Sequence, residues 1–180
     1  LFGRIKSHSL SFDGVARKLR MPEQSVQSVQ HITFSLKRRI NASPTQVFMA
    51  WSNPSVKRRW FVGPRGQWKE RIREFDFRVG GRERLVGVFL DGKASTYDAR
   101  FLDIVPERRI IYTFELYGDK KKVSVSLATL EFSPAGAGTQ LLYREQALIL
   151  DSSDDAGKRE KRTSVLFDQM EASLRVKPVA

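Results

Sequence analysis

Alternation of apolar and polar residues begins near His31 and dominates the chain as far as about residue 150. Ile32, Phe34 and Leu36 alternate with polar neighbours, and this spacing of two predicts a strand with one buried face. The alternation continues between Gly, Pro, Asn and Asp turn residues, and it predicts six more strands over residues 71–79, 82–90, 95–105, 109–117, 122–132 and 139–150. Because the links are short, consecutive strands are expected to pair as antiparallel neighbours in a meander.

Two short helices are predicted directly after the first strand. Ser43 is a favoured N-cap residue and Pro44 suits the first helical position. The apolar residues that follow fall on one helical face. Asn53 and Pro54 end this helix and begin a second one over residues 54–61.

A long C-terminal helix is predicted over residues 158–176. Its apolar stripe has helical spacing and consists of Leu166, Phe167, Met170 and Leu174. A helix of this length spans about 28 Å, and a twisted sheet of seven strands curls around such a helix. The expected fold class is therefore α+β, a helix-grip fold in which a seven-stranded curved antiparallel sheet wraps around a long C-terminal helix, with two short helices after the first strand.

The domain organisation is expected to be an N-terminal extension over residues 1–30 and one domain over residues 31–180. The first twenty residues hold five Lys or Arg against one acid, Asp13, and show little apolar periodicity. They read either as flexible upstream or expression-derived sequence before Met21, or as a targeting peptide, and the sequence leaves both open.

Composition excludes several classes of site. The chain has no cysteine and two histidines, so disulfides, thiolate metal sites and histidine-rich metal sites are excluded. We expect no metal and no cofactor, since Gly80 and Gly81 lack the strand–loop–helix setting of a dinucleotide site. No apolar run reaches about 18 residues, so no membrane span is expected, and a cytoplasmic location fits the lack of cysteine.

The chain is basic, with a net charge of +12 and an isoelectric point near 10.3. Such charge favours binding to phosphates, but the basic residues are scattered and accompany no recognition helix or zinc finger, so nucleic acid is disfavoured as a partner. Basic clusters at residues 37–39 and 57–59 are compatible with binding to an acidic protein partner. The sequence also leaves a homodimer open.

Five segments together resemble a known family: RRINASPTQVFMAWSNP, WFVGP, EFDFRVGG, YDARFLDIVPERRIIYTFEL and GTQLLYRE. In this order the chain resembles the START-like (SRPBCC) superfamily, within it the small proteins similar to the C-terminal domain of the heat-shock-protein ATPase activator. The resemblance spans residues 32–174 and implies the helix-grip fold. Members bind lipids, polyketides and other apolar molecules, cyclise polyketides, or assist a chaperone.

The leading functional hypothesis is that the protein binds a small hydrophobic or amphipathic ligand in an internal cavity. A binding protein is favoured over an enzyme. One alternative is a chaperone-associated or other protein-interaction module. Another is a polyketide cyclase/dehydratase-like enzyme, although no residue of the chain is assigned a catalytic role.

The candidate cavity-lining residues are apolar or aromatic side chains from the helices and the middle strands, namely Trp51, Trp60, Phe61, Tyr97, Tyr112, Phe114, Phe167 and Met170. For each of them, ordinary core packing is the alternative. Two arginines complete the set. Arg38 could bind a carboxylate or phosphate of a ligand, or it could pair with a carboxylate such as Glu145. Arg78 could act as a gate or contact an anion at the cavity mouth, or it could stabilise its turn.

Overall fold

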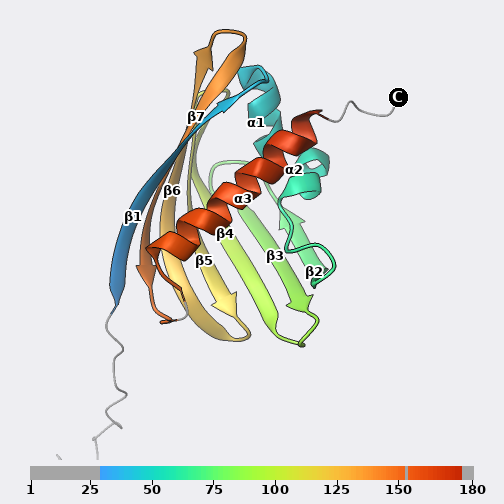
Figure 1. Cartoon of the computed structure of the whole chain (residues 1–180), viewed down its shortest axis with the longest axis vertical. Helices are drawn as coiled ribbons and strands as arrows, with labels where there is room; N and C mark the ends of the chain where they lie inside the picture. The colour runs from blue at the N-terminus through green and yellow to red at the C-terminus, as the bar shows by residue number, and fades with distance from the viewer. Residues whose placement is uncertain (1–28, 153, 176–180) are drawn as a thin grey trace, which may run out of the picture.

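A seven-stranded antiparallel sheet forms the frame of the molecule (Figure 1). The computed structural model describes residues 29–152 and 154–175. The spatial order of the strands is β1-β7-β6-β5-β4-β3-β2. The strands are β1 (Gln30–Ile40), β2 (Trp68–Phe75), β3 (Arg82–Phe89), β4 (Ala94–Val105), β5 (Arg109–Gly118), β6 (Lys121–Ala135) and β7 (Gly138–Ile149). The predicted helix-grip fold is confirmed. Strand β1 pairs with β7 and forms one edge of the open sheet, and β2 forms the other edge.

Two short helices follow β1, as predicted. Helix α1 (Pro44–Ser52) begins with a capping box, in which Ser43 Oγ accepts from the Gln46 amide at 3.3 Å and Gln46 Oε1 accepts from the Ser43 amide at 2.9 Å. Helix α2 (Pro54–Trp60) is capped by Asn53, whose side-chain oxygen accepts from the first backbone amides of the helix.

Strand β2 lies earlier in the chain than residues 71–79, where the alternation predicts it. It ends at Phe75 because the chain turns back immediately afterwards, with the Gly81 amide donating to Arg78 O at 2.8 Å. A Cβ at Gly81 would lie 2.1 Å from Asp76 O, so the turn requires glycine there. The strand gains residues at its start because Trp68 packs over Gly87 of β3.

The long helix α3 (Ala156–Arg175) crosses the concave face of the sheet obliquely toward α1 and α2 (Figure 1). Asp155 caps it, since its carboxylate accepts from the Lys158 amide at 2.9 Å. Phe167 and Met170, 1% and 0% exposed, point into the sheet, as the apolar stripe predicts.

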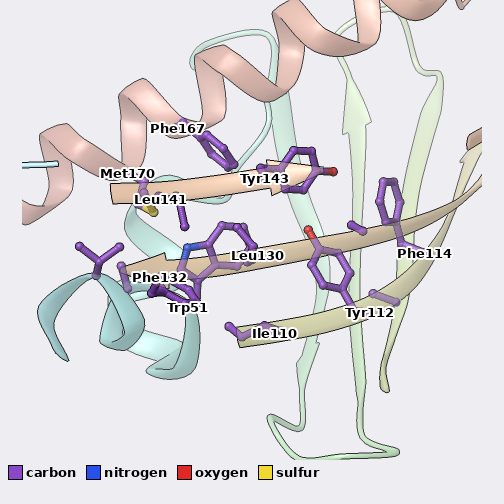
Figure 2. Packing of buried hydrophobic residues seen from close by; sticks show 14 of the residues in the cluster. Trp51, Ile110, Tyr112, Phe114, Leu130, Phe132, Leu141, Tyr143, Phe167 and Met170 are labelled. Atoms are coloured by element: carbon purple, nitrogen blue, oxygen red, sulfur yellow. The ribbon is translucent and has the colours of Figure 1, made fainter. Parts of the chain in front are cut away.

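The core lies between the C-terminal half of α3, α1 and the β5–β7 side of the sheet (Figure 2). Trp51 is at its centre. The Trp51 ring makes edge contacts with Trp60 at 4.9 Å and Phe167 at 6.1 Å between centroids. These rings therefore fill the space between helix and sheet in this region.

Replacing Gly87 by Ala should destabilise the fold. A Cβ there would lie 1.8 Å from the Trp68 indole, displacing the ring and its 2.9 Å hydrogen bond to Ser95 Oγ. We expect a loss of about 1–3 kcal/mol, the usual cost of overpacking, measured by chemical unfolding. Gly118→Ala is the matched control, because its nearest neighbour would be Val123 at an ordinary 3.6 Å. Equal effects of the two changes would contradict this account.

Candidate functional site

A buried ion pair joins α2 to β3. Lys57 and Glu83 are 2% and 1% exposed, and Lys57 Nζ lies 2.5 Å from Glu83 Oε2. The other carboxylate oxygen, Glu83 Oε1, has no hydrogen-bond partner among the residues that the structure describes. Removing two charges from water costs several kcal/mol per ion, so this pair persists only because its geometry is close and its surroundings are favourable.

Aromatic rings supply those surroundings. The faces or edges of five rings approach the ammonium with centroids 5.0–6.0 Å from Nζ, and they belong to Trp51, Trp60, Phe61, Phe75 and Phe101. Cation–π attraction offsets part of the desolvation cost. Desolvation nevertheless dominates and lowers the pKa of Lys57, while the charge and hydrogen bond of Glu83 act in the opposite direction.

A second buried polar group lies beneath the first turns of α3. The Glu145 carboxylate of β7 accepts from Tyr143 Oη at 2.6 Å and from Ser126 Oγ at 2.8 Å. Arg159 of α3 approaches the same carboxylate at 3.5 Å, and it donates to Asp154 at 2.6 Å. Arg162 also pairs with Asp154, at 3.1 Å, so two arginines face two carboxyl groups here.

Burial shifts the acidities of the side chains around Glu145. Burial raises the pKa of the Glu145 carboxyl, although bonds from Tyr143 and Ser126 and the charge of Arg159 oppose the shift. Burial also raises the pKa of Tyr112 and of Tyr143. These phenols therefore stay protonated throughout the physiological range and act as hydrogen-bond donors. Figure 2 shows Tyr112 and Tyr143 rising from their strands toward the space below α3.

Part of the concave face carries aromatic side chains that are not fully covered. Tyr97 of β4 is opposite Leu116 of β5, and both are half-buried. The half-buried Phe61 ring contacts Tyr97 at 4.8 Å, and Tyr97 contacts Phe114, 7% exposed, at 5.3 Å. We call Phe61, Tyr97, Phe114 and Leu116 the open aromatic surface. Tyr97 follows the β3–β4 hairpin closely in the chain, whereas α3 contacts chiefly β1, α1 and α2.

The predicted cavity-lining residues divide between these two regions. Trp51, Trp60, Phe167 and Met170 are at most 4% exposed and belong to the filled core. Phe61, Tyr97 and Phe114 form most of the open aromatic surface. Tyr112, 5% exposed, lies between them, because its ring contacts both Trp51 and Phe114.

The two candidate arginines bind protein groups. Arg38 is half-buried, hydrogen-bonds to the Ser164 hydroxyl of α3 and pairs with Asp168 at 3.3 Å. Arg78 is exposed and pairs with Asp76 at 2.9 Å in the turn after β2. Each arginine thus has a structural role in the described chain.

Sequence reasoning missed the burial of Lys57 and Arg159. Both stand in basic runs that look solvent-exposed, and the cluster at residues 57–59 accordingly presents only Arg58 and Arg59 at the surface. One signal was available for Glu145, since it alternates in step with Tyr143 and Ala147 on the buried face of β7.

An open depression of about 340 Å³ lies on the opposite, convex face. Its outward-facing lining includes Thr113, Leu127, Gln146 and Leu148, from β5, β6 and β7. Residues that alternate with these, such as Ala147, face the concave side. This depression is the alternative to the open aromatic surface as a place where an apolar ligand could bind.

Two further features bear on partners. Within residues 29–152 and 154–175, no group of three or more His, Asp or Glu side chains is arranged to hold a metal ion. No helix of this part of the chain combines the length and hydropathy needed to cross a bilayer.

Lys57→Met should be strongly destabilising, because it leaves the Glu83 carboxylate buried without its cation. We expect a loss of about 3–5 kcal/mol in unfolding free energy, measured by denaturant titration. The double variant Lys57→Met/Glu83→Leu should recover most of the loss. Lys93→Met, which removes an exposed pair with Asp91, is the control and should leave the melting temperature nearly unchanged. A double variant no more stable than Lys57→Met would contradict this interpretation.

Glu145→Gln should change the pH dependence of stability. Because the folded-state pKa of Glu145 is raised, the folded protein keeps a proton that the unfolded chain releases near its ordinary pKa of about 4.3. The contribution of Glu145 to stability is therefore full below that value and is lost as the pH rises through the folded-state pKa.

Unfolding free energies are measured between about pH 4 and pH 8. As the pH rises through this window, the unfolding free energy of wild type should fall relative to that of Glu145→Gln. Glu160→Gln, at an exposed position of α3, is the control. A difference between wild type and Glu145→Gln that grows in favour of wild type with rising pH would refute the assignment.

Comparisons with known proteins agree with this fold. A family model described as "Activator of Hsp90 ATPase homolog 1-like protein" matches residues 41–175. The Mll3558 protein from Rhizobium loti is 38% identical, with a TM-score of 0.74 over 81% of this chain and 99% of that chain. A putative uncharacterized protein from Rhizobium leguminosarum is also 38% identical, with a TM-score of 0.77 over 82% of this chain and 96% of that chain.

More distant structures share the fold alone. An AHSA1-like protein from Aeromonas hydrophila is 17% identical, with a TM-score of 0.58 over 79% of this chain and 92% of that chain. Among curated proteins no match is found. The match of the family model to three quarters of the sequence confirms the resemblance stated above, and the chain belongs to the Activator of Hsp90 ATPase homolog 1-like protein family of the START-like superfamily.

Proposed function

We propose that this protein binds a small apolar or amphipathic molecule on the open aromatic surface. The observation that carries the proposal is the state of Tyr97. Its ring contacts those of Phe61 and Phe114, with centroids 4.8 and 5.3 Å away, yet the residue remains half-buried and keeps part of its surface accessible to solvent. An aromatic side chain that packs against other rings and still keeps exposed area offers apolar surface that a small molecule can cover.

The surrounding side chains suit an apolar ligand. Leu116 and Phe61 pack against the core on one side and keep exposed area on the other. Covering that area would remove apolar surface from water, at roughly 25 cal/mol per Å². The START-like fold commonly binds hydrophobic ligands, which supports the same assignment.

The ligand would not lie beneath the C-terminal half of α3. Trp51, Phe167 and Met170 fill that space, and inserting a molecule there would require repacking a dense core. The open aromatic surface needs no such change. The proposed site is therefore beside the helix, toward the β3–β4 hairpin.

Two leucine variants test the position of the site. Leu116 and Leu127 are partly exposed leucines on neighbouring strands, and they face opposite sides of the sheet. Diphenylhexatriene, a hydrocarbon that fluoresces in apolar surroundings, is titrated into wild type and each variant. Leu116→Ser should weaken binding about fivefold, since it removes roughly 1 kcal/mol of apolar contact.

Leu127→Ser is the matched control and should bind the probe as wild type does. Native mass spectrometry of the same mixtures gives the stoichiometry, expected to be one probe per chain. Wild type that binds no probe, or binding that is lost in Leu127→Ser and kept in Leu116→Ser, would refute the proposed function.

A further inference from the structure

The two edges of the open sheet differ in how they are protected from pairing with a further strand. Strand β2 is interrupted by a bulge between Glu70 and Ile72, and most of its residues are charged. Strand β1 pairs with β7 over its whole length without any register shift. Edge strands avoid pairing with other chains by means of bulges, charged side chains and proline. Strand β1 is therefore the less protected edge.

The unprotected part of β1 is its first half. Residues 30–36 contain no Lys, Arg, Asp, Glu or Pro, whereas the basic residues 37–39 follow directly. Figure 1 shows β1 as the outermost strand on its side of the sheet. Among the described residues, the backbone of β1 pairs only with β7, so the outward amide and carbonyl groups of residues 30–36 can receive another strand.

The side-chain pattern of this half is complementary to itself. Ile32 and Phe34 are buried toward the concave face, and Thr33 is exposed on the convex face. If two copies pair antiparallel about Thr33, this threonine lies opposite its own counterpart, and Ile32 of each copy lies opposite Phe34 of the other. A pair of aliphatic and aromatic side chains directly opposite each other stabilises a sheet.

Charge favours this register over the alternatives. An axis at Lys37 would set two lysines opposite each other, and like charges in that position are destabilising. An axis at Ser35 would set Arg39 opposite His31 and would place the Arg38 position against an apolar residue. With the axis at Thr33, no charged residue lies within the paired segment 30–36.

The residues that flank the segment also fit. Val29 is exposed directly before β1. In the register centred on Thr33, it would lie opposite Lys37 of the second copy. The aliphatic part of a lysine side chain can cover an apolar neighbour while its ammonium group stays in water. Arg38 keeps its contacts with Ser164 and Asp168 of α3 in this arrangement.

We propose that two copies of this chain associate through the first half of β1, by antiparallel pairing of residues 30–36 about a two-fold axis at Thr33, so that their sheets become continuous. The contact is the same patch on both copies, as a two-fold interface requires. It is also short, and interfaces of small area give weak, concentration-dependent association. This interface lies apart from Tyr97 on β4 and does not depend on the function proposed above.

Sedimentation equilibrium of the full chain over a concentration series tests the association. The apparent mass should rise from that of the monomer toward that of the dimer. Thr33→Lys should weaken association at least about tenfold, because it sets two ammonium groups opposite each other at the axis. Ser133→Lys is the matched control, since it adds the same charge at an exposed position of the inner strand β6 and should associate as wild type does.

A second charge variant separates repulsion at the axis from damage to the strand. Thr33→Glu should associate as weakly as Thr33→Lys. An equimolar mixture of the two variants should recover the dimer, because opposite charges then meet at the axis.

Thiol cross-linking tests the register. The chain has no cysteine, so Thr33→Cys introduces a single thiol. Directly opposite Cα atoms of an antiparallel pair are about 4.5–5.5 Å apart, a distance that suits a disulfide, so mild oxidation should link this variant into dimers. Ser35→Cys, exposed on the same face, is the control. Its two thiols would be separated by about 14 Å along the paired strands and should not link.

Each outcome bears on the proposal. Wild type that stays monomeric over the whole series overturns it, because the edge is then covered by another part of the chain or serves a different protein. Association that Thr33→Lys leaves unchanged places the interface elsewhere, and linkage of Ser35→Cys in place of Thr33→Cys refutes the register. Loss of association in both charge variants, its recovery in their mixture and linkage of Thr33→Cys alone support the proposal.

Discussion

The structure depends on the burial of one apolar stripe of α3 against a sheet that curves around it. A twisted sheet of seven strands is wider than one helix, so the helix covers only part of the concave face. The covered part is closed by Phe167 and Met170 and becomes the core. The uncovered part must still present apolar side chains, because the same strands run through both regions with the same alternation. The open aromatic surface is thus a geometric consequence of the fold.

Buried charge is the second constraint, and the chain satisfies it locally. Lys57 pairs with Glu83 inside a ring of aromatic side chains, and Arg159 is balanced by Asp154 and Glu145. Each buried cation ties a helix to the sheet or to the loop before it. Such pairs contribute little net stability compared with apolar packing, yet removing one partner is costly, so they make the placement of α2 and α3 specific.

The two constraints together shape the proposed function. Packing leaves aromatic surface partly exposed at Tyr97, and ion pairing accounts for the buried cations Lys57 and Arg159. The net charge of +12 therefore does not by itself define the ligand of the open aromatic surface. Net charge governs long-range encounter, whereas a binding surface is governed by the few groups that form it.

Local chemistry in the sequence determined most of the architecture. Alternation predicts the strands, Ser43 and Asn53 predict the helix starts, and the stripe through Phe167 predicts which face of α3 is buried, because each signal acts over a few residues. Tertiary structure alone decided the rest. A basic run does not reveal that Lys57 enters an aromatic cage, since the rings come from distant segments. Nor does an aromatic residue reveal whether it fills the core, as Trp51 does, or remains accessible, as Tyr97 does, because coverage depends on where a helix crosses the sheet.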